Sequence, residues 1–266
     1  MQASELIKAI EAYAPIELAM DGDPVGLQIG DATRDIKTVM TTLDVRPETV
    51  AEAIEKNVDF IFAHHPAVFR PARNLDLANP QNKMYADLLK HDIIVYAAHT
   101  NLDAAVGGMN DWLAAVLGIQ NTRPILPNPD GQSGLGRIGQ LAKPTTVAAY
   151  AEFVRETFAV KAVRVIANDL QREIQTIAVL GGDGGSEYPA AQAAGADAYV
   201  TADLYYHTGH DVLADDFVVI DPDHHMEAIA KPEMVALVQR WKTAHNWDLT
   251  NVFASEINTD PYTYII

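Results

Sequence analysis

The sequence predicts an α/β fold of two interlinked lobes with mainly parallel sheets. Short apolar runs rich in β-branched and aromatic residues alternate with amphipathic segments of helical period along most of the 266 residues. Such alternation is typical of βαβ units, and therefore of parallel sheets. Residues 124–137, rich in proline and glycine, interrupt the alternation and indicate the junction between the lobes.

The first expected lobe, residues 1–125, begins with a helix that Ser4 caps and that ends near Pro15. Its apolar side chains recur at the spacing of a single buried stripe. Residues 21–30 then form a turn that feeds a strand. The other expected strands of this lobe are residues 38–44, 58–63 and 93–98, and its other expected helices are residues 47–56 and 81–90.

The second expected lobe, residues 126–266, alternates in the same way. Its expected strands are residues 162–167, 176–180, 198–201 and 217–220. Its expected helices are residues 146–157, residues 189–195 and a short helix that includes residues 211–214. The C-terminal segment of this lobe could pack back on the first lobe.

The composition bounds the class of protein. The chain is 48% hydrophobic and 21% charged, which is ordinary for a globular protein with a sizeable core. It has no cysteine, so disulfides, thiolate metal sites and a cysteine nucleophile are excluded. The N-terminus lacks a basic segment followed by an apolar core, and no apolar run approaches the ~18 residues of a membrane span. We therefore expect a soluble, cytoplasmic protein that has no membrane partner.

The net charge of −17 opposes nucleic acid as a main partner, because the basic residues are few and scattered. A small phosphorylated substrate such as a nucleotide remains open. Bound metal ions can supply the local positive charge that the rest of the surface lacks.

Five candidate metal ligands lie in three short pieces, each behind an apolar strand: His64 with His65, Asp103, and His224 with Glu227. The carboxyl ends of strands are where open α/β sheets bind ligands. Adjacent side chains on extended backbone point to opposite faces, so His64 and His65 suit two ions side by side rather than one. His224 and Glu227 project from one face if a helix begins there, and Glu227 could bridge the two ions.

This ligand set predicts a catalytic centre with two divalent metal ions per subunit, in the cleft between the lobes. Three imidazoles and two carboxylates leave open coordination positions, which distinguish catalytic from structural sites. Two ions roughly 3.5–4 Å apart favour hydrolysis. The set fits Zn, Mn, Fe, Co or Ni and does not choose among them. A histidine pair alone more often lies at the surface, or hydrogen-bonds to a metal ligand, than binds a metal itself. The occurrence of three such segments at strand ends favours metal binding.

Three further residues are candidates for catalysis. His99 could orient Asp103 or move protons, and Asp203 and His207, which follow the strand at residues 198–201, suit proton transfer or substrate contact. A hydrogen-bonded polar loop is the equal alternative for Asp203 and His207. The glycine-rich residues 181–186 could cradle a phosphate, but they match no nucleotide fingerprint, and a tight strand-to-helix turn is the simpler interpretation.

Five motifs occur in a fixed order, at residues 23–30, 63–66, 99–103, 201–207 and 220–227. In combination they resemble those of the GTP cyclohydrolase I type 2 homologue family, the Nif-three-like dimetal proteins, along nearly the full chain. The resemblance implies a two-lobed subunit, a ring-shaped homohexamer and a dinuclear metal site with ligands His64, His65, Asp103, His224 and Glu227.

The family's name implies hydrolytic opening of the guanine ring of GTP by metal-bound hydroxide. A non-catalytic, metal-dependent scaffold or regulatory protein that forms a ring is the alternative. The chain departs from the family pattern at Asp223 and Ala202, where glycine is usual, which leaves the surroundings of the site and the substrate preference open.

Overall fold

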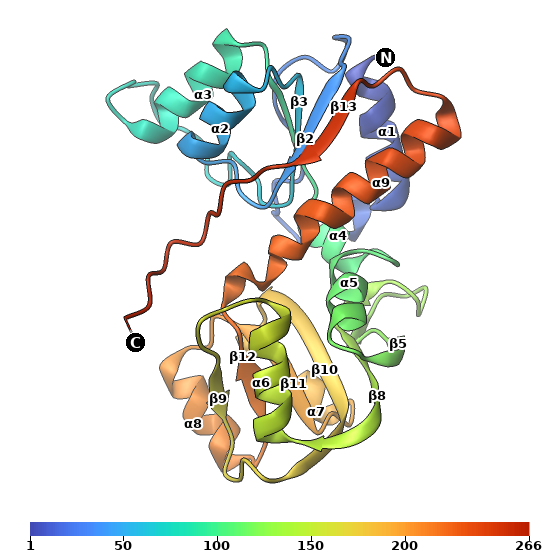
Figure 1. Ribbon diagram of the computed structural model, residues 1–266, viewed down its shortest axis with the longest axis vertical. Helices are drawn as coiled ribbons and strands as arrows, with labels where there is room; N and C mark the ends of the chain where they lie inside the picture. The colour runs from blue at the N-terminus through green and yellow to red at the C-terminus, as the bar shows by residue number, and fades with distance from the viewer. Residues whose placement is uncertain (266) are drawn as a thin grey trace. The chain divides into compact units, whose positions relative to one another are not determined.

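The computed structural model describes residues 1–265, which form two compact units (Figure 1). Unit 1 consists of Met1–Leu102 and Ala228–Asp260. Unit 2 consists of Asp103–Glu227 and residues 261–265. Ile266, the last residue of the second expected lobe, lies outside the described residues.

This division differs from the boundary expected at residue 125. The helix α5 (Met109–Val116) packs on the sheet of unit 2 and the strand β5 (Gln120–Arg123) belongs to that sheet, although both precede that boundary. In the opposite sense, the helix α9 (Ala230–His245) packs on the sheet of unit 1, and the strand β13 (Asn251–Ala254) belongs to it. The C-terminal part of the chain therefore returns to the sheet that the N-terminal part builds.

The proline- and glycine-rich residues 124–137 lie inside unit 2 and form a hairpin. The strands β6 (Leu126–Pro127) and β7 (Gly134–Leu135) pair antiparallel there. At Gly134 the backbone has φ +139°, and a Cβ atom would lie 2.2 Å from the Leu126 carbonyl oxygen. Gly134 thus fits a close approach of the two strands that excludes a side chain, and residues 124–137 do not link the two units.

Unit 1 is built on a five-stranded sheet in the order β1-β4-β3-β2-β13. The strands are β1 (Gly26–Ile29), β4 (Ile94–Ala97), β3 (Phe60–Ala63), β2 (Thr38–Thr42) and β13. Only β1 runs antiparallel to its neighbour. The helices α2 (Pro47–Glu55) and α3 (Pro80–Lys90) cover one face, and α1 (Ala3–Tyr13) and α9 cover the other (Figure 1). β3 and β4 are buried throughout because both faces are covered.

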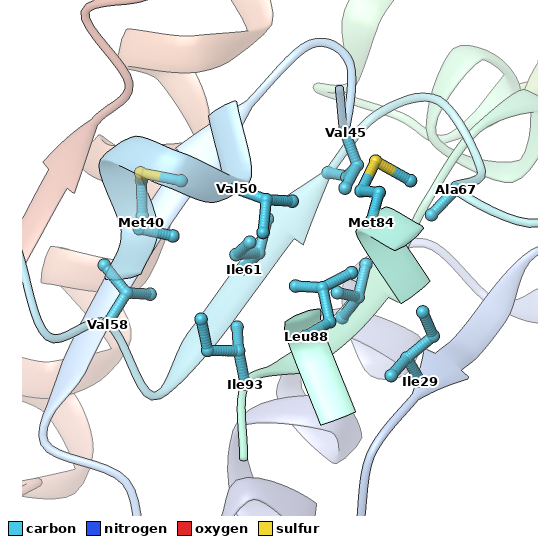
Figure 2. Packing of buried hydrophobic residues seen from close by; sticks show 13 residues of the cluster. Ile29, Met40, Val45, Val50, Val58, Ile61, Ala67, Met84, Leu88 and Ile93 are labelled. Carbon is cyan, nitrogen blue, oxygen red and sulfur yellow. The ribbon is translucent and has the colours of Figure 1, made fainter. Parts of the chain in front are cut away.

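The core of unit 1 follows the strand register. Met40, Ile61 and Val95 lie opposite one another on adjacent parallel strands and so share a face of the sheet. Val50 of α2 and Leu88 of α3 pack against this face (Figure 2).

Unit 2 is built on a six-stranded sheet in the order β5-β8-β10-β11-β12-β9. The strands after β5 are β8 (Arg137–Thr146), β10 (Glu173–Asp183), β11 (Ala198–Ala202), β12 (Val219–Asp221) and β9 (Arg164–Ile166). Only the pairs β10–β11 and β11–β12 are parallel. The mainly parallel sheet that was expected therefore describes unit 1, whereas the sheet of unit 2 is mixed.

Helices cover both faces of the second sheet. The helix α7 (Tyr188–Ala193) and α8 (Tyr206–Ala214) contribute to one buried cluster with β10, β11 and β12. The helices α5 and α6 (Val147–Thr157) lie on the other side (Figure 1). The shorter elements of the chain are α4 (Thr100–Ala104) and the 3-10 helices η1 (Ile16–Leu18), η2 (Gly185–Glu187) and η3 (His224–Ile229). Within residues 1–265, no helix has the length and apolar character that crossing a membrane requires.

Replacement of Leu88 by alanine tests the core of unit 1. Leu88 is fully buried, so we expect Leu88→Ala to lower the free energy of unfolding by about 2–5 kcal/mol. The neighbouring Leu89 is 62% exposed, and Leu89→Ala should change the free energy of unfolding by no more than about 0.5 kcal/mol. Urea unfolding of both variants measures the difference; equal effects would contradict the packing described.

Glu52 of α2 is a buried carboxyl that holds the chain just after β13. It accepts hydrogen bonds from the Ser255 hydroxyl, from the Glu256 backbone N–H at 3.0 Å and from Lys56 Nζ at 2.8 Å. Burial opposes the charge of Glu52, but the hydrogen bonds from Glu256, Lys56 and Ser255 outweigh it and lower the pKa of this carboxyl. The ionised form therefore stabilises the fold.

The pH dependence of Glu52→Gln tests this interaction. Since the folded-state pKa of Glu52 lies below its ordinary value of 4.5, its contribution is complete above that value and is lost as the pH falls through the lower folded-state pKa. We expect Glu52→Gln to cost about 1–3 kcal/mol at neutral pH, and the gap to wild type to close in acid. Thermal unfolding across pH measures it, with the exposed Glu55→Gln of the same helix as control.

Candidate metal centre

Three histidines of unit 1 gather where two parallel strands end. His64 and His65 follow β3, and their backbone N–H groups continue the ladder with bonds to the Thr42 and Leu43 carbonyls at 3.0 and 2.9 Å. His99 follows the neighbouring strand β4. The ring centroids are 5.0 to 5.4 Å apart, and one nitrogen from each ring lies within 4.8 Å of the others. These residues form a three-histidine cluster that could hold a metal ion.

His64 and His65 each point Nδ1 at an oxygen that can only accept. His64 Nδ1 lies 2.9 Å from the Ala98 carbonyl oxygen, and His65 Nδ1 lies 2.8 Å from Asp44 Oδ1. In a neutral imidazole the hydrogen is then on Nδ1 and the lone pair is on Nε2. This arrangement is the usual one for histidines that bind a metal through Nε2, because the outer acceptor fixes both the tautomer and the ring orientation.

His99 is held in the same way by a buried carboxylate. Asp23 Oδ1 lies 2.9 Å from His99 Nδ1, and Asp23 Oδ2 accepts from the backbone N–H and the hydroxyl of Thr100. Burial opposes the ionisation of Asp23, but the hydrogen bonds from His99 and Thr100 outweigh it and lower the pKa of this carboxyl. His99 was expected to orient Asp103 or to move protons; in the structure Asp23 orients its ring, which joins the other two histidines.

Unit 2 carries a second set of candidate ligands on η3. This helix is of the 3-10 type, in which residues three apart lie above one another, so His224 and Glu227 face the same side. His224 Nε2 lies 3.2 Å from Glu227 Oε2. Two ligand atoms at about 2.0–2.2 Å from one ion, at ordinary coordination angles, lie about 3.0–3.4 Å apart. The pair is therefore spaced as two ligands of a shared cation would be.

Asp203 orients His224. Its Oδ2 lies 2.7 Å from His224 Nδ1, which repeats the arrangement of the three histidines of unit 1. Asp203 follows β11 in a left-handed backbone conformation, with φ +53°. Asp203 is thus hydrogen-bonded to a candidate metal ligand, and its expected role in proton transfer or substrate contact stays a prediction.

Two glycines at the end of β10 make room for the Glu227 carboxylate. A Cβ atom on Gly181 would lie 2.8 Å from Glu227 Oε1, and one on Gly182 would lie 2.8 Å from the same oxygen and 3.2 Å from His224 Nε2. Gly182 also has φ +64°. Close packing against Glu227 and His224 therefore accounts for these glycines without a bound phosphate.

Asp103 lies on α4 and is tied to the same turn by a buried asparagine. Asn110 Nδ2 donates to the Asp103 carbonyl at 3.0 Å, and Asn110 Oδ1 accepts from the Gly181 N–H at 3.0 Å. The side chain of Asn110 thus links the backbones that carry Asp103 and the glycine turn. Sequence reasoning did not single out Asn110.

His207 is separate from these groups. It lies on α8, is exposed, and its ring contacts those of Tyr205, Tyr206 and His210. Within residues 1–265, His207 is in none of the groups of side chains spaced to hold a metal ion. Its expected role in proton transfer or substrate contact stays a prediction.

Sequence reasoning also missed the carboxylates Asp44 and Asp23 that hold two of the histidines. The sequence did contain a signal for Asp44, because this residue is the last of the strand expected at residues 38–44. Like the histidines, it is a polar residue at the carboxyl end of a strand, where open α/β sheets bind ligands. Asp23 lies just before β1, in the first of the motifs that carry the family resemblance.

The sequence matches the model of the family Duf34/NIF3 (NGG1p interacting factor 3) over residues 1–261. The chain belongs to the Duf34/NIF3 family.

Two curated relatives with the name GTP cyclohydrolase 1 type 2 homolog extend this finding. That of Streptococcus pneumoniae serotype 4 is 43% identical over 268 residues, which cover 100% of each chain. That of Lactococcus lactis is 40% identical over 229 residues, which cover 85% of this chain and 87% of the relative. Among solved structures, a Bacillus cereus protein related to NIF3 superposes with a TM-score of 0.95 at 28% identity, covering 100% of this chain and 99% of that one. The Duf34/NIF3 fold and the family resemblance inferred from the motifs are thereby confirmed.

Asp203→Asn tests whether Asp203 orients His224 for metal binding in this Duf34/NIF3 chain. The asparagine can turn its amide N–H toward Nδ1, which would move the imidazole hydrogen to Nε2, as in the wrong-tautomer variants of catalytic triads. We expect about 10–100-fold weaker metal binding, measured by competition with a chelator. Asp215→Asn, a carboxylate of unit 2 that accepts from the Tyr188 hydroxyl, is the control. Unchanged affinity in Asp203→Asn would contradict the role of Asp203.

Proposed function

We propose that the chain is a metal-dependent hydrolase with two divalent cations per subunit, bound by His64, His65, Asp103, His224 and Glu227. The observation that carries this proposal is that the Nδ1 atom of each of these three histidines meets a carbonyl or carboxylate oxygen at 2.7 to 2.9 Å. Such outer acceptors are typical of metal-binding imidazoles. Imidazole and carboxylate donors without sulfur suit Zn, Mn, Fe, Co or Ni.

The proposed ligands come from both units, and the path of the chain supports this. The chain leaves unit 1 after Leu102 and returns to it after Glu227. Asp103 and Glu227 are therefore the two residues of unit 2 at these crossings, each bonded directly to a residue of unit 1.

In the proposed hydrolysis, the protein side chains have different roles. Bound divalent cations supply Lewis acidity and positive charge, which suit the hydrolysis of a polar bond. His99 is the group we propose for proton transfer, because Asp23 accepts a hydrogen bond from its Nδ1 and leaves Nε2 as the nitrogen that can take up a proton. Asp203 orients His224, and His207 is proposed to contact the substrate from α8.

The proposed substrate is a purine nucleotide. The curated relatives bear the name GTP cyclohydrolase 1 type 2 homolog, which supports hydrolytic opening of the guanine imidazole ring with release of formate. The exposed ring of Phe69, whose centroid lies 6.4 Å from that of His99, offers an aromatic surface to a base. The chain's excess of acidic residues makes bound cations the natural partners of the phosphates.

A metal-dependent scaffold is the second candidate function. The description of the family as NGG1p interacting factor 3 favours it, since those words denote an interaction with another protein. In that case the cations would stabilise a ring-shaped homohexamer that partner proteins bind. Light scattering on the metal-loaded and metal-stripped protein measures the proposed assembly.

Metal content and turnover, measured on the same samples, test the hydrolase. We expect about two ions per wild-type subunit by plasma mass spectrometry, together with turnover of GTP. His64→Ala and Glu227→Ala should lose both, because each removes a proposed ligand. His91→Ala in unit 1 and the exposed Glu156→Ala in unit 2 are matched controls that should keep both.

The outcomes separate the candidate functions. Two ions without turnover of GTP, or of a panel of nucleotides, phosphoesters and amides, would favour the scaffold. Absence of metal from wild-type protein prepared with excess divalent cations would show that the metal centre itself is wrong.

A further inference from the structure

The described residues after β13, residues 255–265, form no helix or strand, yet side-chain hydrogen bonds hold them at defined points. We call residues 255–265 the C-terminal strap. At its start, Glu52 accepts from the Ser255 hydroxyl and from the Glu256 N–H, and Lys231 Nζ donates to two strap carbonyls at 3.0 Å each. Burial lowers the pKa of Lys231. These contacts anchor the strap well before its end.

Further along, the strap reaches the carboxylate that orients His65. Thr259 Oγ1 donates to Asp44 Oδ2 at 2.5 Å, and Asp44 Oδ1 accepts from His65 Nδ1 at 2.8 Å. The strap therefore holds one oxygen of Asp44, and the histidine holds the other. A carboxylate with hydrogen bonds at both oxygens cannot rotate about its Cβ–Cγ bond without losing one of them. The Thr259 hydroxyl therefore limits rotation of the Asp44 carboxylate, which in turn orients the imidazole of His65.

In unit 2, the strap reaches the residue that precedes His224. The Tyr264 hydroxyl donates to Asp223 Oδ2 at 2.5 Å, and Asp223 Oδ1 accepts from the His224 backbone N–H at 2.7 Å. As at Asp44, the strap donates a hydrogen bond to one oxygen of the Asp223 carboxylate and the histidine donates one to the other.

Asp223 occupies a position where the backbone favours glycine. Its φ of +78° lies in the left-handed region, which costs a residue with a Cβ atom free energy. Besides its two side-chain bonds, its backbone N–H donates to Asp221 Oδ1 at 2.9 Å, and Arg164 Nη2 lies 2.5 Å from the second oxygen of Asp221. Hydrogen bonds, including the one from Tyr264 of the strap, thus hold Asp223 in a strained loop conformation. A glycine at this position would have no carboxylate to accept the hydrogen bond from Tyr264.

We propose that the C-terminal strap positions two metal-binding histidines: Thr259 acts through Asp44 on His65, and Tyr264 acts through Asp223 on His224. Both are positioning residues, since neither is itself a metal ligand. The proposal rests on the proposed metal centre. If a hydroxyl is lost, the carboxylate that it held gains rotational freedom, and the imidazole or the loop behind it is held less tightly. Because one hydrogen bond is at stake in each case, we expect metal affinity to fall by about 2–10-fold.

Cobalt binding by the full-length chain tests the strap. Thr259→Val and Tyr264→Phe each delete one hydroxyl and should weaken Co²⁺ binding about 2–10-fold in competition with a chelator. They should also change the visible absorption of the bound Co²⁺, which reports its coordination geometry. Thr259→Ser keeps the hydroxyl and should restore both properties, an outcome that a merely structural role of the threonine methyl group would not produce.

Two matched controls delete the same kinds of hydrogen bond elsewhere. Thr33→Val removes the bond from Thr33 Oγ1 to Asp31 Oδ1, 2.8 Å long, in unit 1. Tyr188→Phe removes the bond from the Tyr188 hydroxyl to Asp215 Oδ2, 3.0 Å long, in unit 2. Both should bind Co²⁺ as the wild type does, with the wild-type absorption spectrum.

A second measurement does not require a metal. In metal-free protein carrying ¹³Cε1-labelled histidine, Thr259→Val should shift the imidazole signal of His65, and Tyr264→Phe that of His224, with the other histidine signals little changed. If wild-type protein bound no Co²⁺, the metal centre would fail, and these signals would still decide whether the strap positions the rings. Unchanged affinity, absorption and imidazole signals in both variants would overturn the proposal.

Discussion

The candidate centre depends on one repeated interaction, the hydrogen bond from a histidine Nδ1 to an oxygen acceptor. The acceptor is a backbone carbonyl for His64 and a carboxylate for His65, His99 and His224. Each bond sets the tautomer, so that the lone pair is on Nε2, and limits rotation of the ring. The carboxylates also add negative charge behind the rings, which strengthens imidazoles as donors to a cation.

The strand order delivers these acceptors to the same edge as the histidines. In unit 1, β2, β3 and β4 are parallel, so the residues that follow them, Asp44, His64 and His99, emerge at one edge of the sheet. β1 is antiparallel to β4, so its beginning lies where β4 ends, and Asp23 just before β1 meets His99 there. The one antiparallel strand of this sheet therefore contributes an acceptor because of its direction.

Unit 2 uses the same rule in a mixed sheet. Its parallel strands β10, β11 and β12 are followed or ended by the glycine turn, by Asp203 and by the segment that leads to His224. The antiparallel strands flank them. The sheet of unit 2, expected to be mainly parallel, thus has a parallel centre that carries the candidate ligands, with antiparallel neighbours on both sides.

The sequence by itself determined the α/β class and the candidate ligands, because alternating apolar runs and polar residues at strand ends are local patterns. The acceptors lie far from their partners along the chain: Asp23 is 76 residues from His99, and Thr259 is 215 residues from Asp44. Likewise, α9 and β13 follow residues 103–227 of unit 2 in sequence, but α9 packs on the sheet of unit 1 and β13 is a strand of it. Only the tertiary structure decided these pairings, since the sequence around a carboxylate or hydroxyl does not indicate which distant group will become its hydrogen-bond partner.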